Sequence, residues 1–138
     1  MARKPRQKRT YLGDGCKADV PTAKKLTAAA GPLAGACIPL AEPRGGVLGI
    51  AEGIETAAAA SLGSGLPVVA AYCANALAGF NFPRDIERLV IFADHDSAGQ
   101  KAATALQHRA AKASLTSKVL TPSKPDHDWA DVWQEGQL

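Results

Sequence analysis

The sequence predicts an α/β fold in which a small, mostly parallel central sheet is flanked by helices. From residue 47 onward, short apolar runs alternate with longer helical stretches, an order typical of this fold class. The run at residues 89–93 contains only apolar side chains, as expected of a strand buried on both faces. Two runs end directly in acidic residues, at Glu52 and near Asp94. Because ligands bind at the carboxyl ends of strands in open α/β sheets, these positions are the first functional candidates.

Length and composition limit the class of protein. The 138 residues are enough for one small domain with a single core. Hydrophobic residues make up 46%, yet no apolar run approaches the roughly 18 residues of a membrane span, and no signal peptide is recognisable. We therefore expect a cytoplasmic protein without a membrane segment. The three cysteines are widely spaced and form no CxxC pair, which argues against a zinc site or a disulfide framework.

The first 45 residues are interpreted as a basic N-terminal arm and an irregular lead-in segment. Five cations fall within the first nine residues, in a chain of net charge +3. Such an arm can bind nucleic-acid phosphates, and a solvated, disordered terminus is the alternative interpretation. The candidate nucleic-acid-binding residues are Arg3, Lys4, Arg6, Lys8 and Arg9. A short strand at residues 9–15 and an edge strand at residues 35–40 are expected to follow, the second kept from the sheet centre by its proline.

The compact domain is expected to span residues 46–138. Its first strand is predicted at residues 47–51 and is followed by a helix over residues 54–62. The helix is expected to bury the stripe of Ile54, Ala57, Ala58 and Leu62 and to end at the glycines that follow it. A second strand is predicted at residues 68–72, and a short helix or turn at residues 74–80.

The second half of the domain repeats this alternation. The strand at residues 89–93 leads into a helix from residue 97 to about residue 113. A last strand is predicted at residues 118–121. A loop and a short helix at residues 126–133 close the domain, with Trp129 and Trp133 four residues apart on one helical face.

Three acidic clusters lie just past apolar runs. The clusters are Glu52 with Glu55, Asp94 with Asp96, and Asp126 with Asp128 and Asp131. A single carboxylate pair could simply cap the next helix. Because the strands of a parallel sheet end at the same edge, however, all three clusters can converge, and they then need a compensating cation. Carboxylate oxygens suit Mg²⁺ or Mn²⁺ far better than Zn²⁺, so we expect a pocket for one of these ions.

Two motifs carry a resemblance to a known family. Val-Leu-Gly-Ile-Ala-Glu-Gly at residues 47–53 and Val-Ile-Phe-Ala-Asp-His-Asp-Ser-Ala-Gly at residues 90–99 resemble those of the Toprim domain. This domain is shared by bacterial-type primases, topoisomerases, small nucleases and recombination proteins. The residues of these two motifs are similar to those of the primase-like proteins of phages and plasmids. The resemblance covers residues 46–134 and implies a Rossmann-like Toprim fold.

The resemblance assigns roles to individual acids. Glu52 matches the glutamate proposed as the general acid or base, and Asp94 and Asp96 match the metal-chelating Asp-x-Asp pair. The third acidic motif of the family can be aligned with either Asp126-His-Asp128 or Asp128-Trp-Ala-Asp131. Asp128 belongs to both alignments and is therefore the favoured site residue. Glu55, Asp126 and Asp131 are additional candidates. Many primases carry an Asp where this chain has Thr56, which is a departure from the family pattern.

The function implied by the resemblance is Mg²⁺-dependent nucleotidyl transfer in the synthesis of RNA primers for DNA replication. The expected partners are a single-stranded DNA template, nucleoside triphosphates, and a replicative helicase or the remainder of a primase. The zinc-binding module and the further subdomain of the primases that it resembles are not seen, so the isolated chain is expected to be incomplete as a polymerase. The alternatives are a small metal-dependent Toprim nuclease and a non-catalytic nucleic-acid-binding module.

Overall fold

The computed structural model describes residues 8–9, 24–25 and 33–136. The chain divides into two compact units, Met1–Leu33 and Ala34–Leu138. The limits expected from the sequence, 1–45 and 46–138, stay a prediction. No helix among the described residues is long and apolar enough to span a membrane.

In the first unit, two short strands pair antiparallel. These are β1 (Lys8–Arg9) and β2 (Lys24–Lys25), with Lys8 opposite Lys25 and Arg9 opposite Lys24. The expectation of a disordered tail is therefore wrong for Lys8 and Arg9, because their backbone belongs to a paired strand. Of the other predictions for this region, Arg3, Lys4, Arg6 and residues 10–15 lie outside the described residues.

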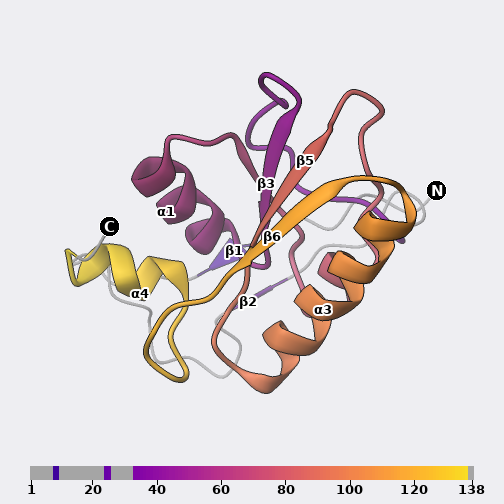
Figure 1. Cartoon of the computed structure of the whole chain (residues 1–138). Helices are drawn as coiled ribbons and strands as arrows, with labels where there is room; N and C mark the ends of the chain where they lie inside the picture. Colours follow the sequence, from indigo (N-terminus) through magenta and orange to yellow (C-terminus); the bar gives the residue numbers. More distant parts are fainter. Residues whose placement is uncertain (1–7, 10–23, 26–32, 137–138) are drawn as a thin grey trace. The chain divides into compact units, whose positions relative to one another are not determined.

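The second unit is built on a four-stranded sheet in the order β4-β3-β5-β6, of which β3, β5 and β6 are labelled in Figure 1. The strands are β3 (Val47–Ala51), β4 (Val68–Ala70), β5 (Arg88–Phe92) and β6 (Thr116–Leu120). All three neighbouring pairs are parallel, which confirms the predicted fold class. Each of the four strands predicted from residue 47 onward is present within two residues of its expected limits.

Helices cover both faces of this sheet (Figure 1). They are α1 (Ile54–Ser64), α2 (Ala74–Ala78), α3 (Ser97–Lys112) and α4 (Trp129–Gln134). On one face, the sheet packs against α2 and α3 through a core that includes Leu48, Ile50, Leu77, Leu89 and Leu106. The opposite face packs against α1 and α4 through smaller side chains, with the Trp129 ring edge-on to Phe92 at 5.8 Å between centroids. Strands β3, β4 and β5 are therefore largely buried between the helices, whereas β6 is partly exposed.

Two details differ from the predictions. The prediction that Ala58 and Leu62 face inward on α1 is wrong, because Ala58 is exposed and Leu62 is 68% exposed. The helix buries Thr56, Ala57, Ala59 and Ala60 in their place. The strand expected at residues 35–40 is reduced to a single antiparallel bridge between Ile38 and Ala70.

Candidate metal and nucleotidyl-transfer site

Glu52 and Asp94 lie at the same edge of the sheet because β3 and β5 end together. The register places Ala51 beside Phe92, so the chain leaves both strands at the same level. Glu52 follows Ala51 directly, and Asp94 lies two residues after Phe92. Parallel pairing therefore brings together two carboxyl groups that are 42 residues apart in the sequence.

The Asp94 carboxyl is the electrostatic centre of this edge. Burial, followed by the charges of Glu52, Asp128 and Asp96 and by a hydrogen bond with the Glu52 side chain, raises the pKa of Asp94 to about 7. One of its oxygens, Oδ1, is buried and has no hydrogen-bond partner in the structure. A buried carboxylate oxygen without a donor is unfavourable, and a bound cation would remove that cost.

The third acidic loop is attached to this edge by backbone hydrogen bonds. The His95 N–H donates to the His127 carbonyl at 2.9 Å, and the Asp126 N–H donates to the His95 carbonyl at 2.8 Å. Asp126 adopts a positive φ of 58°, an uncommon conformation for a residue other than glycine. This pairing holds the loop beside residues 94–96 and brings the Asp128 charge within reach of Asp94.

Two of the four neighbouring acids also cap helices. Asp96 Oδ1 accepts a hydrogen bond from the Gly99 N–H at 2.7 Å at the start of α3. Asp128 and Asp131 form a capping box at the start of α4, with hydrogen bonds of 2.9 and 3.0 Å. Capping and metal binding are compatible, because a cap uses one carboxylate oxygen and leaves the other. The same bonds fix the direction in which Asp96 and Asp128 point.

The structure thus brings four of the seven acidic candidates together: Glu52, Asp94, Asp96 and Asp128. The other three acids are not among the groups that raise the pKa of Asp94. Glu55 is half-buried in the first turn of α1, Asp126 is exposed in the loop, and Asp131 completes the capping box. Thr56, at the position where many primases carry an Asp, is 3% exposed within α1.

These residues fit a divalent cation, although the ligand set is not preassembled. Among the residues that the structure describes, no group of three or more His, Cys, Asp or Glu side chains is arranged around a common metal position. The Asp94 and Glu52 side chains are hydrogen-bonded to each other, and a shared proton lowers the repulsion between them. The buried, unpartnered Asp94 Oδ1 and the surrounding carboxylates are the chemistry that Mg²⁺ or Mn²⁺ prefers.

Sequence reasoning missed the residues that position the site through their backbone. His95 holds the third loop in place. Tyr72 follows β4 at a positive φ of 73°, and its N–H donates to the Glu52 carbonyl at 2.7 Å. A Cβ at Gly99 would lie 2.7 Å from the Asp94 carbonyl oxygen, so only glycine lets α3 start this close to the strand end. Gly99 is the last residue of the motif at residues 90–99, whereas the pairings of His95 and Tyr72 carry no local sequence signal.

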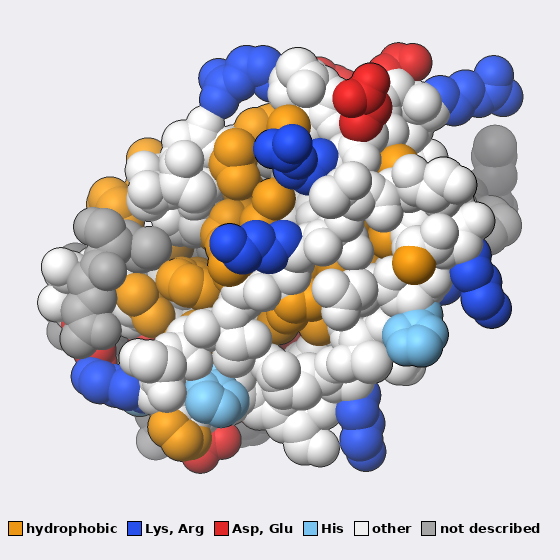
Figure 2. Space-filling model, in the orientation of Figure 1, with side chains coloured by type: hydrophobic (Ala, Val, Ile, Leu, Met, Phe, Trp, Pro, Cys, Tyr) orange, Lys and Arg blue, Asp and Glu red, His pale blue; other side chains and the backbone are white. Residues whose placement is uncertain are grey.

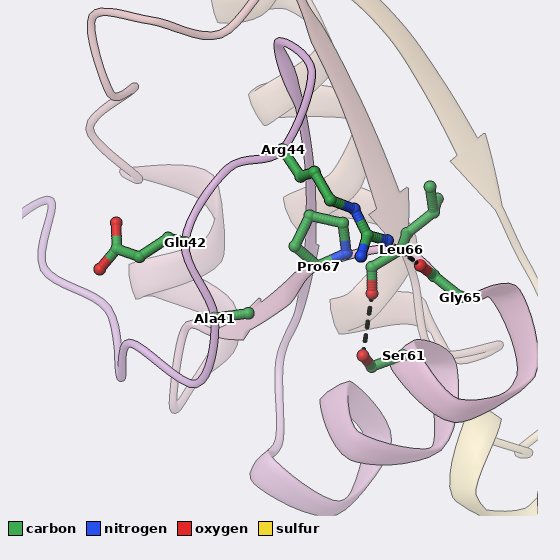
Figure 3. Close-up of a pocket in the computed structure, with 7 residues that line it drawn as sticks. All are labelled: Ala41, Glu42, Arg44, Ser61, Gly65, Leu66 and Pro67. Atoms are coloured by element: carbon green, nitrogen blue, oxygen red, sulfur yellow. Dashed lines mark hydrogen bonds between the residues drawn. The ribbon is translucent and has the colours of Figure 1, made fainter.

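A hollow of about 240 Å³ lies elsewhere, at the carboxyl end of α1 (Figure 3). Arg44 donates a hydrogen bond to the Gly65 carbonyl there, and the Ser61 hydroxyl donates to the Leu66 carbonyl. None of the seven acidic candidates lines this hollow. These two hydrogen bonds satisfy carbonyls that directly follow α1, so the hollow is a structural feature and not a second acidic site.

Comparison with solved structures supports the fold. The chain is similar to a DNA primase domain from Pseudomonas aeruginosa, with a TM-score of 0.61 and 14% sequence identity. It is also similar to the primase fragment of the bacteriophage T7 primase-helicase protein, with a TM-score of 0.60 and 18% identity. The match covers 96% and 99% of this chain but only 47% and 62% of those two structures. No curated protein sequence matches the chain.

The family is shown by the sequence itself. The family model described as "Toprim domain" matches residues 47–137, which include all four strands of the sheet and all seven acidic candidates. Divalent metal binding is a general property of Toprim domains. The chain therefore belongs to the Toprim family.

Proposed function

We propose that this chain is the Toprim catalytic domain of a DNA primase and that it supports metal-dependent nucleotidyl transfer in RNA primer synthesis. The observation that carries the proposal is the position of Asp94, whose half-buried carboxyl has Glu52, Asp128 and Asp96 as its acidic neighbours. Such a cluster is unfavourable without a cation and is well suited to holding one beside phosphate oxygens.

Asp94 would hold the ion, supported by Asp128 and Asp96. When bound, Mg²⁺ or Mn²⁺ supplies charge neutralisation at the phosphate oxygens during transfer. The primer 3′-hydroxyl oxygen attacks the α-phosphorus of a nucleoside triphosphate, the new P–O bond forms, and pyrophosphate leaves. Glu52, at the same sheet edge as Asp94, would accept the proton of that hydroxyl.

The proposed partners follow from the structural neighbours. One is a primase domain and the other comes from a protein that also carries a helicase. A single-stranded DNA template, nucleoside triphosphates, and a replicative helicase or the rest of a primase are therefore the partners to test.

An assay with labelled single-stranded DNA and nucleoside triphosphates tests the proposal. With Mn²⁺ or Mg²⁺, the chain supplemented with the remainder of a primase should make short RNA products, and EDTA should prevent this. Asp94→Asn and Glu52→Gln should each abolish synthesis, whereas Glu42→Gln, an exposed acid outside the cluster, should not. Metal-dependent shortening of the DNA with no RNA product would identify a nuclease and overturn the primase proposal.

A further inference from the structure

The loop at residues 121–128 joins β6 to α4 and carries Asp128. Figure 1 shows it beside the start of α3, and Figure 2, in the same orientation, shows a histidine and acidic side chains at the molecular surface there. The loop is attached to the end of β5 at two places. At its far end, the His95 N–H donates to the His127 carbonyl, and the Asp126 N–H donates to the His95 carbonyl. The position of Asp128 relative to β5 therefore depends on these attachments.

The near end of the loop is attached through a side chain of α3. Gln100 lies in the first turn of that helix, and its side-chain amide donates to the Asp94 carbonyl at 2.9 Å and to the Thr121 hydroxyl at 3.2 Å. Next to this contact, the Ala93 N–H donates to the Leu120 carbonyl at 2.9 Å. One amide group thus joins α3, the end of β5 and the first residue of the loop.

The chemistry of the contact fixes the orientation of the Gln100 amide. The NH₂ group has two donors, and both are used. The opposite orientation would bring the amide oxygen to 2.9 Å from the Asp94 carbonyl oxygen, and two acceptors repel each other. Gln100 is half-buried, so water has limited access to replace these bonds.

Both attachments of the loop meet at a single peptide group, the one that joins Asp94 to His95. Its carbonyl accepts from Gln100, and its N–H donates to the His127 carbonyl. The same carbonyl is crowded by α3, because a Cβ at Gly99 would lie 2.7 Å from it. Rotation of this peptide group would redirect the Asp94 side chain and release the loop. The bonds at its two ends oppose that rotation.

We propose that Gln100 is a positioning residue, whose amide fixes the Asp94 carboxyl and the loop that carries Asp128 so that both acids serve one metal ion. The inference rests on the proposed function and deepens it, because it names the group that sets the geometry of the acids. The Gln100 amide donates to a backbone carbonyl and a hydroxyl, so it acts through its neighbours and not on the ion. The charge of Asp128 reaches Asp94, as the proposal requires of the attached loop.

Calorimetric titration with Mn²⁺ tests the proposal without any catalytic step. Gln100→Met keeps the length of the side chain but has no donor, and it should bind Mn²⁺ about tenfold more weakly. Thr121→Val removes the hydroxyl and should bind about threefold more weakly, whereas Thr121→Ser keeps the hydroxyl and should match the wild type. Two controls on the same helix should also match it. Thr104→Val removes a hydroxyl that donates to the backbone carbonyl of Gln100, and Gln107→Met changes a half-buried glutamine outside the contact. Wild-type affinity in Gln100→Met, or an equal loss in the controls, would overturn the proposal.

A double variant tests whether the two side chains act through one contact. Gln100→Met/Thr121→Val should bind Mn²⁺ no more weakly than Gln100→Met alone, because the first substitution has already removed the bond that the second would remove. Losses that multiply would show that the two side chains act independently, which would refute the joint described here.

Hydrogen exchange separates positioning from a loss of overall stability. In metal-free Gln100→Met, the amides of His95 and Asp126 should exchange about tenfold faster, because their bonds hold the loop. The acceleration at Ile50, whose amide lies in the buried strand β3 and reports the stability of the whole fold, should be several times smaller. Equal acceleration at all three amides would show only a general destabilisation and would contradict the proposal.

The two proposals fail separately. If the wild type binds Mn²⁺ and Gln100→Met binds it equally well, only the inference on Gln100 is removed. If Gln100→Met loses Mn²⁺ affinity as expected but the wild-type chain, supplemented with the remainder of a primase, makes no RNA, only the proposed function is removed. A wild-type chain that binds no Mn²⁺ would remove both.

Discussion

The side chain of Asp94 is hydrogen-bonded to that of Glu52, which comes from the end of the neighbouring parallel strand. Two carboxyl groups can form such a bond only if they share a proton. Because burial and neighbouring acids raise the pKa of Asp94 to about 7, the pair holds that proton close to neutral pH. A divalent ion and this proton therefore compete for the same oxygens.

The first prediction concerns the stability of the metal-free protein. The pKa of Asp94 is raised in the folded chain, from 3.8 to about 7, so its contribution to stability is full below about pH 4 and is lost as the pH rises through 7. In EDTA, we expect the free energy of unfolding to fall by about 1–2 kcal/mol between pH 5 and pH 8, after discounting for solvent screening. The melting temperature should then fall by several degrees. Calorimetry should show that Asp94→Asn loses this dependence of stability on pH. Asp85→Asn, which changes an exposed acid, should keep it. A flat wild-type profile would contradict the prediction.

The second prediction separates proton transfer from metal binding. Glu52→Gln removes a negative neighbour and so lowers the pKa of Asp94, which should make the metal-free protein more stable at pH 8. Mn²⁺ should still bind through the aspartates, within about tenfold of the wild-type affinity. In an active preparation, nucleotidyl transfer should fall by about 10²–10⁴-fold. Full turnover by Glu52→Gln would show that this carboxyl is not the acid or base.

The third prediction uses the two members of the capping box. Asp128→Ala and Asp131→Ala should each destabilise α4 by about 0.5–2 kcal/mol, because each removes a helix-capping hydrogen bond. Only Asp128 acts on Asp94, so only its loss should weaken Mn²⁺ binding, by about tenfold. Asp128→Ser should restore the cap and the stability but not the metal affinity. Equal metal affinities for the two alanine variants would place Asp128 outside the site.

The fourth prediction concerns a residue with no functional group. Gly99→Ala would place a Cβ 2.7 Å from the Asp94 carbonyl oxygen, so α3 and the strand end must separate. We expect a loss of about 1–3 kcal/mol in unfolding free energy and weaker Mn²⁺ binding. Gly79→Ala is the matched control, since its Cβ would meet nothing closer than 3.4 Å and should cost less than about 0.5 kcal/mol. Similar losses in the two variants would contradict the close-approach argument.

Much of the second unit could be predicted because its signals are local. The apolar run ending before Asp94 and the helical pattern after Asp96 each lie within one short segment, and both are found where expected. The inward face of α1 was wrong for a local reason as well. The middle of that helix is a run of alanines, so the sequence gives little contrast between an inward and an outward side, and Leu62 is exposed to solvent.

The geometry of the candidate site depended on contacts that no local pattern contains. The pairing of His95 with Asp126 and His127 joins residues 31 and 32 positions apart, and it holds the loop so that Asp128, rather than Asp131, acts on Asp94. The choice of Asp128 made from the sequence rested on its presence in both alignments of the motif. The positive φ of Tyr72 follows from how β4 ends beside Glu52, which is likewise a tertiary constraint.

Calorimetric titration of Mn²⁺ into the wild-type chain and Asp94→Asn, at pH 7.0 in two buffers of different ionisation enthalpy, tests the central claim most directly. We expect the wild type to bind the ion and to release part of a proton, because the metal displaces the proton held near Asp94. Asp94→Asn should bind at least tenfold more weakly and release no proton. Equal affinities, or no binding to the wild type at millimolar Mn²⁺, would show that the acidic edge of the sheet is not a metal site.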